Sequence, residues 1–569
     1  MTSFGKERPI DTQQAPTPII TTEEVPILIA PEAPAIASPA HGGARWRRAI
    51  AAGLLGGVVA LFAMLLMMVA QRVWLGVPTP PESIPDRIAP LLRIPEFFSL
   101  FDRFGGYNGL KRFGILSMLG GIVAVGIGVG LLYALFTENS RTAEPTKPRR
   151  FGLSPVALVF VAVVVALLWI GTLAIELPVL DTNFRGLSPG PATLFTVVGL
   201  LISYLTYGVI LVLVCRALTN DAPLGASSAP IAGQLLGRRA AITGGVAVIA
   251  GIGLGASLAR LNKRAVFTYD GRQYKGATVQ AITPNDQFYS VTKNVIDPNP
   301  TKAFWRLEVG GKADHGRTYS FNDLAALAPI EQETTLMCIS NGIGSGLMSN
   351  AKWKGVPLRM LLDAAGPHAG VVEVKLSGAD GYTDTIPFDK AMDPTTLVVY
   401  EMNGAPIPQR HGYPVRVIVP GMYGEKNVKW VTGIELVDRP VKGFYEQQGW
   451  GPDFVVPTRS RIDVPDGGPP LPAGKPTTIR GIAFGGNRGI SRVEVSMDDG
   501  ATLRDARIDY PGTKLTWALW SADWTPTRPD MYHLVVRATD GTGAPQISAF
   551  HDITPQGARG YDRITVQVV

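Results

Sequence analysis

The chain has 569 residues, more than one hydrophobic core usually serves, so we expect several domains. Its net charge is only +7, and its basic residues are scattered without interleaved aromatic residues, which argues against a nucleic-acid partner. Mean hydropathy is +0.17 although 17% of the residues are charged. This combination predicts that apolar and polar residues are segregated into different regions of the chain.

The two cysteines, Cys215 and Cys338, lie in regions of different character. A disulfide framework is therefore not expected. A zinc site built on cysteine is not expected either, because no second Cys and no nearby His stands at ligand spacing.

Residues 1–44 are rich in Pro, Thr, Ala and Glu and show neither helical nor strand periodicity. Such a segment buries too little apolar surface to offset the entropy of ordering, so we interpret it as a disordered tail.

Five apolar runs follow, each close to the length of roughly 20 residues that a helix needs to cross a bilayer. Their interiors lack Lys, Arg, Asp and His, and several are rich in Gly, which suits close helix packing in lipid. Buried core helices are the alternative, but five such runs in succession argue against it. We predict a five-helix transmembrane module over 45–260, with spans near 49–70, 113–136, 154–176, 192–214 and 240–258.

The basic residues near the ends of these runs suggest an orientation. Clusters before the first run, between the second and third, and between the fourth and fifth share one face, which predicts a cytoplasmic N-terminus. The loop 71–112 on the opposite face is also basic, so the bias is moderate. We expect a multi-pass plasma-membrane protein, in contact with lipid, whose soluble part is extracytoplasmic. Arg238 and Arg239 fit either a twin-arginine export signal or simple positive-inside anchors.

Within loop 71–112, the stretch Ile94–Phe104 mixes aromatic and charged residues. This pattern fits an interfacial amphipathic helix and an ordinary extramembrane loop equally well.

From about residue 265 the composition changes to short alternating apolar segments separated by Gly, Pro and Asp. We predict an α+β domain over 265–465, then a Pro- and Gly-rich linker. Short strands over 476–569 predict an immunoglobulin-like β-sandwich without the paired cysteines of antibody domains. The expected fold class is thus multi-domain: all-α transmembrane helices, an α+β domain and a C-terminal sandwich.

Cys338 ends an apolar strand and precedes a polar, Gly-rich loop. A lone cysteine is most often a small buried hydrophobe, but this one stands at the head of an ordered series of segments. The series comprises Thr335–Asn341, Trp353–Leu358, Ser377–Tyr382, Tyr400–Gly404, Arg410–Arg416 and Val419–Trp430. In this order and spacing it resembles the molybdopterin-binding domain of the sulfite oxidase family, over about 280–465. The C-terminal region resembles that family's dimerisation domain.

The resemblance implies a molybdenum–molybdopterin cofactor and a homodimer. Cys338 matches the family's metal ligand, and a soft thiolate suits such a metal. A planar guanidinium and an ammonium, from Arg416 and Lys429, suit the cofactor phosphate. The alternative is that these two are solvated strand residues paired with Glu401 or Glu435. The positions matched to cofactor binding are Asp286, Phe288, Tyr289, Gly378, His411, Arg416, Asn427, Val428 and Lys429.

The chain departs from the family pattern where sulfite would bind. The loop after Cys338 has no basic residue, and an expected arginine is replaced by the region Val291–Lys293. The family's catalytic tyrosine falls at or next to Trp450, which we take as the catalytic position. Sulfite is a small dianion that needs several positive donors, so we expect a small-molecule substrate that is uncharged or bulkier, such as an S-oxide.

We therefore predict a two-electron, oxygen-atom-transfer enzyme. No apolar run contains His and no CxxCH motif occurs, so we expect no haem in this chain and electrons to pass through a separate protein partner or a quinone. A non-catalytic receptor or scaffold that keeps the domain is the competing interpretation. A transporter is disfavoured because only Glu176, at the edge of a run, is charged.

Overall fold

The computed structural model describes residues 40–143, 155–219 and 237–569. The chain divides into two compact units, 1–47 and 48–569, and apart from the first residues of one helix the features below belong to the second. The predicted tail, except residues 40–44, and the basic loop between the second and third apolar runs lie outside the described residues.

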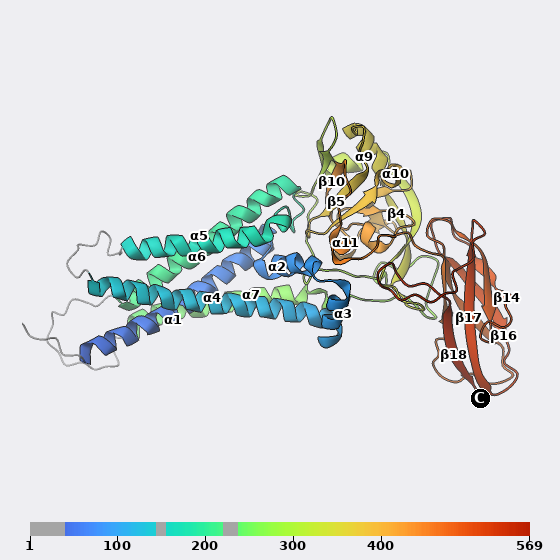
Figure 1. Ribbon diagram of the computed structural model, residues 1–569, viewed down its shortest axis with the longest axis horizontal. Coiled ribbons are helices and arrows are strands. Elements are labelled where there is room, and N and C mark those ends of the chain that lie inside the picture. Colours follow the sequence, from blue (N-terminus) through green and yellow to red (C-terminus); the bar gives the residue numbers. More distant parts are fainter. Residues whose placement is uncertain (1–39, 144–154, 220–236) are drawn as a thin grey trace, which may run out of the picture. The chain divides into compact units, whose positions relative to one another are not determined.

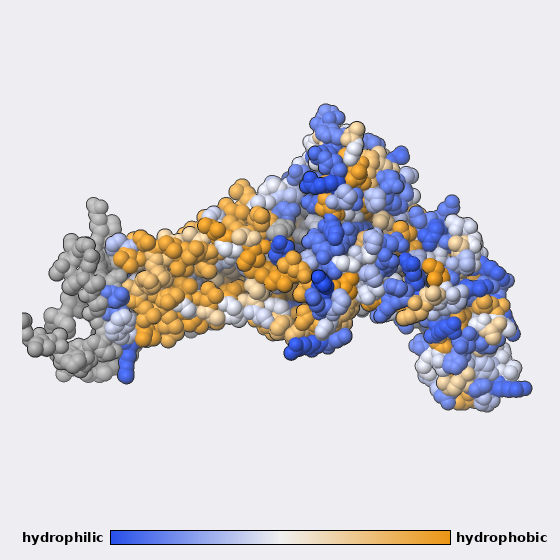
Figure 2. All heavy atoms as spheres, viewed as in Figure 1, coloured by the Kyte–Doolittle hydropathy of each residue, from blue (hydrophilic) through white to orange (hydrophobic). Residues whose placement is uncertain are grey.

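The apolar runs form long helices, over which Figure 2 shows apolar residues gathered. Four of the helices described are long and apolar enough to cross a membrane, over Trp46–Trp74, Tyr107–Asn139, Pro155–Glu176 and Pro189–Thr219. The fifth run is also helical, but its role as a span stays a prediction. The N-terminal helices in Figure 1 are α1 (Ala40–Trp74), α2 (Pro80–Ile88), α3 (Ile94–Arg103), α4 (Tyr107–Ala143), α5 (Pro155–Glu176), α6 (Pro189–Thr219) and α7 (Gly237–Lys263).

Glycines bring α1 and α4 into backbone contact. A Cβ atom built on Gly130 would lie 2.5 Å from the Gly53 carbonyl oxygen and 2.7 Å from the Gly57 Cα atom. Only a residue without a side chain permits this approach, as is typical of helix pairs in lipid. Tyr207 of α6 donates a hydrogen bond to the Gly126 carbonyl, which links a third helix to the pair.

The connection between α1 and α4 folds into two short helices. Thr79 precedes α2 and exchanges hydrogen bonds with Glu82, and Pro80 occupies the first turn, as expected at a helix start. Gly105 and Gly106 have φ angles of +72° and +95°, which allow the sharp turn from α3 into α4. The segment that fitted two interpretations is thus helical, and Ile94 and Phe98 pack against the β-rich part of the chain.

The next region contains one mixed sheet, one antiparallel sheet and short helices. In the first sheet the order is β2-β1-β10-β5-β6, with β1 parallel to β10; in the second it is β3-β4-β7-β8, with β9 also paired to β7. A core of fully buried aliphatic side chains, including Leu307, Leu376 and Val417, holds the region together. Its strands are β1 (Arg306–Gly311), β2 (Arg317–Ser320), β3 (Ile330–Met337), β4 (Met348–Pro357), β5 (Glu373–Gly378), β6 (Thr383–Pro387), β7 (Leu397–Met402), β8 (Ala405–Pro406), β9 (Arg416–Ile418) and β10 (Val431–Val437). Its helices are α8 (Phe321–Ala325), α9 (Leu358–Ala365), α10 (Phe388–Met392) and α11 (Phe444–Gln448).

The C-terminal region consists of two four-stranded antiparallel sheets, ordered β11-β12-β16-β15 and β14-β13-β17-β18. Alternating side chains of both sheets, among them Ile479, Trp520 and Val536, form one core, as in a two-layer β-structure. The strands are β11 (Arg459–Val464), β12 (Thr477–Phe484), β13 (Ile490–Ser496), β14 (Arg504–Asp505), β15 (Arg507–Tyr510), β16 (Ala518–Trp524), β17 (Asp530–Asp540) and β18 (Asp562–Val568).

The contact between α1 and α4 can be tested with a matched pair of glycines. We expect Gly130→Val to lower the free energy of unfolding by about 1–3 kcal/mol, because the new side chain collides with backbone. Gly128→Val puts the same residue into the same helix where no atom lies within 4 Å of the new Cβ, so it serves as the control. Thermal unfolding in detergent measures both; equal destabilisation would contradict a close α1–α4 contact.

Candidate active site

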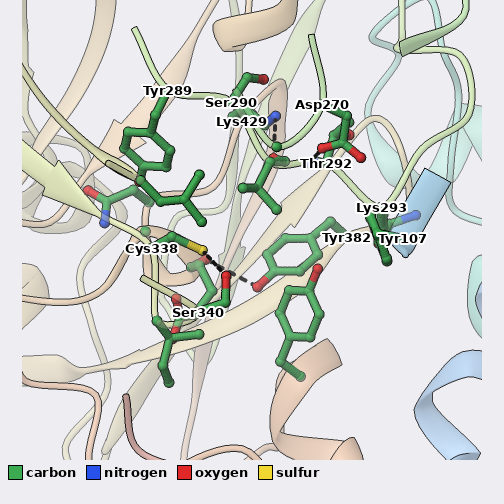
Figure 3. Close-up of a pocket in the computed structure, with 18 of the residues that line it drawn as sticks. Tyr107, Asp270, Tyr289, Ser290, Thr292, Lys293, Cys338, Ser340, Tyr382 and Lys429 are labelled. Carbon is green, nitrogen blue, oxygen red and sulfur yellow. Dashed lines mark hydrogen bonds between the residues drawn. The ribbon is translucent and has the colours of Figure 1, made fainter. Parts of the chain in front are cut away.

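A cavity of about 630 Å³ lies at the end of β3. Its walls come from distant parts of the sequence: the α3–α4 turn, the loops around Asp270 and Lys293, the end of β3, and the loops flanking β9 and α11. Cavities of this size hold cofactors and small substrates. Figure 3 shows Cys338 and Ser340 on one side of the cavity and Lys293 and Tyr107 on the other.

Cys338 is the first residue after β3, and its sulfur enters the cavity 3.1 Å from the Ser340 hydroxyl. Burial raises the pKa of the Cys338 thiol to about 11, and the nearby Glu425 carboxyl acts in the same direction. A bound metal cation would reverse this preference, because coordination removes the thiol proton. The position suits a metal ligand better than an unassisted nucleophile.

Three basic side chains face the cavity further along the chain. The Arg416 guanidinium donates hydrogen bonds to the carbonyls of His411 and Asn427, both at 3.0 Å, and its Nε atom has no partner. Lys429 Nζ donates hydrogen bonds to the carbonyls of Val291 and Arg410 and lies over the Trp430 ring. Among the described residues, neither cation forms an ion pair with a carboxylate. The alternative pairing is wrong, because Glu401 pairs with Lys354 and Glu435 with Lys375.

The electrostatics of the basic side chains Arg416, Lys429 and His411 favour an anionic ligand. Arg416 is 4% exposed, and burial lowers its pKa to about 10. Burial also lowers the pKa of Lys429, and burial together with the neighbouring cations holds the pKa of His411 well below its usual value. Neutral His411 then donates Nε2–H to the Asn285 carbonyl at 3.1 Å. Buried cations without a counter-charge are costly, and a bound phosphate would compensate them.

The other predicted cofactor positions divide into two groups. Phe288, Tyr289, Asn427 and Val428 line the cavity, whereas Asp286 and Gly378 are not among its lining residues. The Asn427 side chain is engaged by the backbone at Val419 and Tyr423, and its carbonyl accepts the hydrogen bond from Arg416. A Cβ atom on Gly378 would lie 2.8 Å from the Lys429 carbonyl oxygen, so this glycine allows Lys429 to approach.

Trp450, the predicted catalytic position, forms part of the cavity wall, and its ring meets Phe98 edge-on at 6.2 Å. Three further tyrosines, which the sequence analysis did not select as site residues, also bring hydroxyl groups to the cavity. Tyr382 donates hydrogen bonds to the Asp384 carboxylate at 2.7 Å and the Glu425 carbonyl at 3.2 Å. Tyr445 and Tyr107 are joined by a side-chain hydrogen bond.

Glu425 was also missed, although it lies within a segment that carries the resemblance. Burial raises its pKa to about 8, and the Asp384 carboxylate adds to the effect. At neutral pH it is therefore mainly a neutral acid that can donate a hydrogen bond into the cavity. No periodicity or spacing in the sequence marks this residue, because its raised pKa arises from burial and from the nearby Asp384 carboxylate in the folded chain.

The cationic groups near Cys338 that could bind a small anion are engaged elsewhere. Arg459 of β11 donates to the carbonyls of Asn341 and Gly342, at 2.6 and 2.7 Å, and so holds the loop after Cys338. Lys293 is paired with Asp86 of α2. The disfavoured binding of sulfite stays a prediction.

Two families of protein domain match the chain. Residues 294–445 match the oxidoreductase molybdopterin binding domain, and residues 454–558 match the Mo-co oxidoreductase dimerisation domain. The first match covers β1 to α11 and includes Cys338, His411, Arg416 and Lys429.

Relatives agree with this assignment. The chain is 30% identical to sulfite oxidase of Gallus gallus, over 46% of this chain and 67% of the relative, and 30% identical to mitochondrial sulfite oxidase of Rattus norvegicus, over 51% and 62%. It is 31% identical to a nitrate reductase of Volvox carteri over 38% of this chain and 32% of that protein. The solved sulfane dehydrogenase SoxCD from Paracoccus pantotrophus matches with a TM-score of 0.44 and 25% identity, over 48% of this chain and 76% of that one.

The chain belongs to the sulfite oxidase family of molybdopterin-dependent oxidoreductases, and its cofactor is the molybdenum cofactor. It spans only 57–62% of the length of the mammalian sulfite oxidases it matches. The cavity residues fit the group: Cys338 provides a thiol for the metal, and Arg416 and Lys429 provide unpaired buried charge for the phosphate.

The role of Arg416 and Lys429 in cofactor binding can be tested by measuring how much cofactor the purified variants retain. We expect Arg416→Met and Lys429→Met each to weaken cofactor binding by about tenfold or more, because each removes a charged donor worth more than 1 kcal/mol. Lys375→Met removes an exposed lysine paired with Glu435 and serves as the control. Molybdenum and pterin content per purified chain are the measurements; equal content in all variants would exclude Arg416 and Lys429 as cofactor contacts.

Proposed function

We propose that this chain is a membrane-anchored molybdenum oxidoreductase that carries out two-electron oxygen-atom transfer on an uncharged small molecule outside the cytoplasm. One observation carries the proposal: the Cys338 thiol and the unpaired cations Arg416 and Lys429 line the same cavity. The thiol is a soft ligand for the metal at one end of a metal–pterin cofactor, and the two cations can bind the phosphate at its other end.

When bound, the molybdenum cofactor supplies a two-electron centre that exchanges an oxygen atom with the substrate. The protein's own residues position and enclose it. Phe288, Tyr289 and Val428 provide apolar wall, and Arg459 fixes the loop that carries Ser340 beside Cys338. Glu425, whose buried carboxyl is mainly neutral at physiological pH and has no hydrogen-bond partner among the described residues, is available to donate a hydrogen bond to a substrate oxygen.

The charges of the side chains around the cavity indicate the class of substrate. A dianion such as sulfite would need free cationic donors, and here the cations on the substrate side are engaged by Asp86 and by backbone carbonyls. S-oxides and N-oxides carry a polar oxygen on an uncharged body, and they match a site with neutral hydrogen-bond donors and aromatic walls.

The proposed placement rests on the four long apolar helices and on the distribution of basic residues. We propose a five-helix module over 45–260 in the plasma membrane. An oxidoreductase domain over 265–465 and an immunoglobulin-like dimerisation domain over 476–569 would lie on the extracytoplasmic side. The dimer proposal is supported by the match of 454–558 to a dimerisation domain. Electrons would pass to or from a separate protein partner or a quinone.

The two cysteines provide a matched test of the chemistry. Replacing a residue that only supports a metal ligand typically lowers activity or metal affinity by about 10–100-fold. We expect Cys338→Ser to lower activity by more, because it removes the proposed ligand itself. Cys215→Ser, whose thiol lies among the apolar helices and contacts the Ala52 carbonyl, should change little. The measurement is dye-linked turnover of the full-length protein across sulfite, S-oxides and N-oxides, together with molybdenum and pterin content. Unchanged turnover in Cys338→Ser would overturn the proposal, and wild-type protein free of molybdenum and pterin would favour a non-catalytic receptor.

The placement is tested separately. We expect the protein to stay in the membrane fraction at alkaline pH, because multiple apolar helices anchor it. A protease added to intact cells or spheroplasts should digest the C-terminal region and leave an N-terminal tag protected. Cleavage of only the tag would reverse the proposed orientation without affecting the chemistry.

A further inference from the structure

The segment between the first two long helices, Pro80–Asn108, forms the roof of the active-site cavity. We call it the roof segment. Phe97, Phe98 and Phe101 of α3 and Tyr107 at the start of α4 line the same cavity as Cys338. The roof segment lies outside the residues matched to either family domain.

Polar contacts attach the roof segment and its flanks to the β-rich region. Lys111 of α4 donates to the Asp270 carboxylate at 2.8 Å and to the carbonyls of Thr292 and Asn294. Gln448 of α11 donates to the Ala89 carbonyl at 2.9 Å. The roof is therefore part of the folded site and not a separate loop.

An ion pair joins Asp86 of α2 to Lys293. The Lys293 side chain is 4% exposed and lines the cavity, and its ammonium group also donates to the Asp380 carbonyl at 2.7 Å. Asp86 forms the ion pair with this lysine, and the Asp380 carboxylate adds to the negative potential at the same ammonium group. Of the described lysines and arginines that line the cavity, Arg416 and Lys429 are assigned to the cofactor, so Lys293 is the cation left for a substrate.

The rest of the roof adds apolar surface in place of charge. Phe98 packs against Trp450, and Phe97 and Phe98 meet edge-on at 5.7 Å. An aromatic lining of this kind favours a ligand with an apolar or aromatic body. An anion in this cavity would have to compete with Asp86 for Lys293.

We infer that the roof segment sets substrate specificity: Asp86 withholds Lys293 from anions, and Phe97, Phe98 and Phe101 bind the apolar body of an uncharged substrate. This inference deepens the proposed function and rests on it. The substrate class is an uncharged oxide with an apolar or aromatic substituent. Asp86 is a positioning residue that acts through Lys293.

The charge element is tested by ligand binding to the full-length, cofactor-loaded protein. Inorganic sulfate is the anionic probe and methyl phenyl sulfoxide the uncharged one, both measured by titration calorimetry. Asp86→Asn frees one cationic donor, so we expect sulfate to bind about tenfold more tightly. Asp102→Asn removes the same charge from an exposed position in the same segment and should leave sulfate binding unchanged. The double variant Asp86→Asn/Lys293→Met should lose the gain.

The aromatic element has its own variant, which decides the question if Asp86→Asn does not fold. Phe98→Ala should weaken sulfoxide binding by about fivefold or more, because it removes buried apolar contact. Leu91→Ala, at a side chain that is 67% exposed in the same segment, is the control. Sulfate binding equal in Asp86→Asn and wild type, or sulfoxide binding unaffected by Phe98→Ala, would overturn the inference. Molybdenum content and the Cys338→Ser result report on the proposed function independently, so the two failures are distinguishable.

Discussion

The site depends on two buried positive charges that form no ion pair among the described residues. Arg416 and Lys429 donate hydrogen bonds to backbone carbonyls and lie over tryptophan rings, in a cavity that also contains a thiol. Carbonyl dipoles orient a guanidinium or an ammonium but do not neutralise it, so an unoccupied arrangement of this kind is costly. An anionic cofactor would relieve this cost, and its binding would be coupled to the stability of the loops that carry both cations.

On the substrate side of the cavity, the basic side chains are engaged by other groups of the protein. Lys293 is matched by Asp86, Lys111 by Asp270, and Arg459 is occupied by the loop after Cys338. Burial raises the pKa of Glu425 and so leaves it mainly uncharged. Little net charge therefore remains for a substrate to neutralise, while neutral donors and aromatic walls are available. Positive charge is concentrated where the cofactor phosphate is expected.

Family membership and the molybdenum cofactor were predicted from the order and spacing of short segments around Cys338, Arg410–Arg416 and Val419–Trp430. The four helices long enough to span a membrane follow from local hydropathy, which a sequence displays directly. Trp450 was placed correctly in the cavity wall but brings no hydroxyl, whereas Tyr382 and Tyr445 do. Spacing along a loop does not tell which aromatic residue turns inward.

The sequence by itself determined the apolar helices, the thiol at a strand end and the basic residues further along, because each depends on residue type and local pattern. Only the tertiary structure decided that Arg416 and Lys429 lack carboxylate partners, that Glu425 is buried, and that Asp86 reaches Lys293 across 207 positions of the chain. The role of α3 was decided in the same way. An amphipathic helix shows the same pattern whether its aromatic face meets lipid or protein, and the contact of Phe98 with Trp450 distinguishes the two.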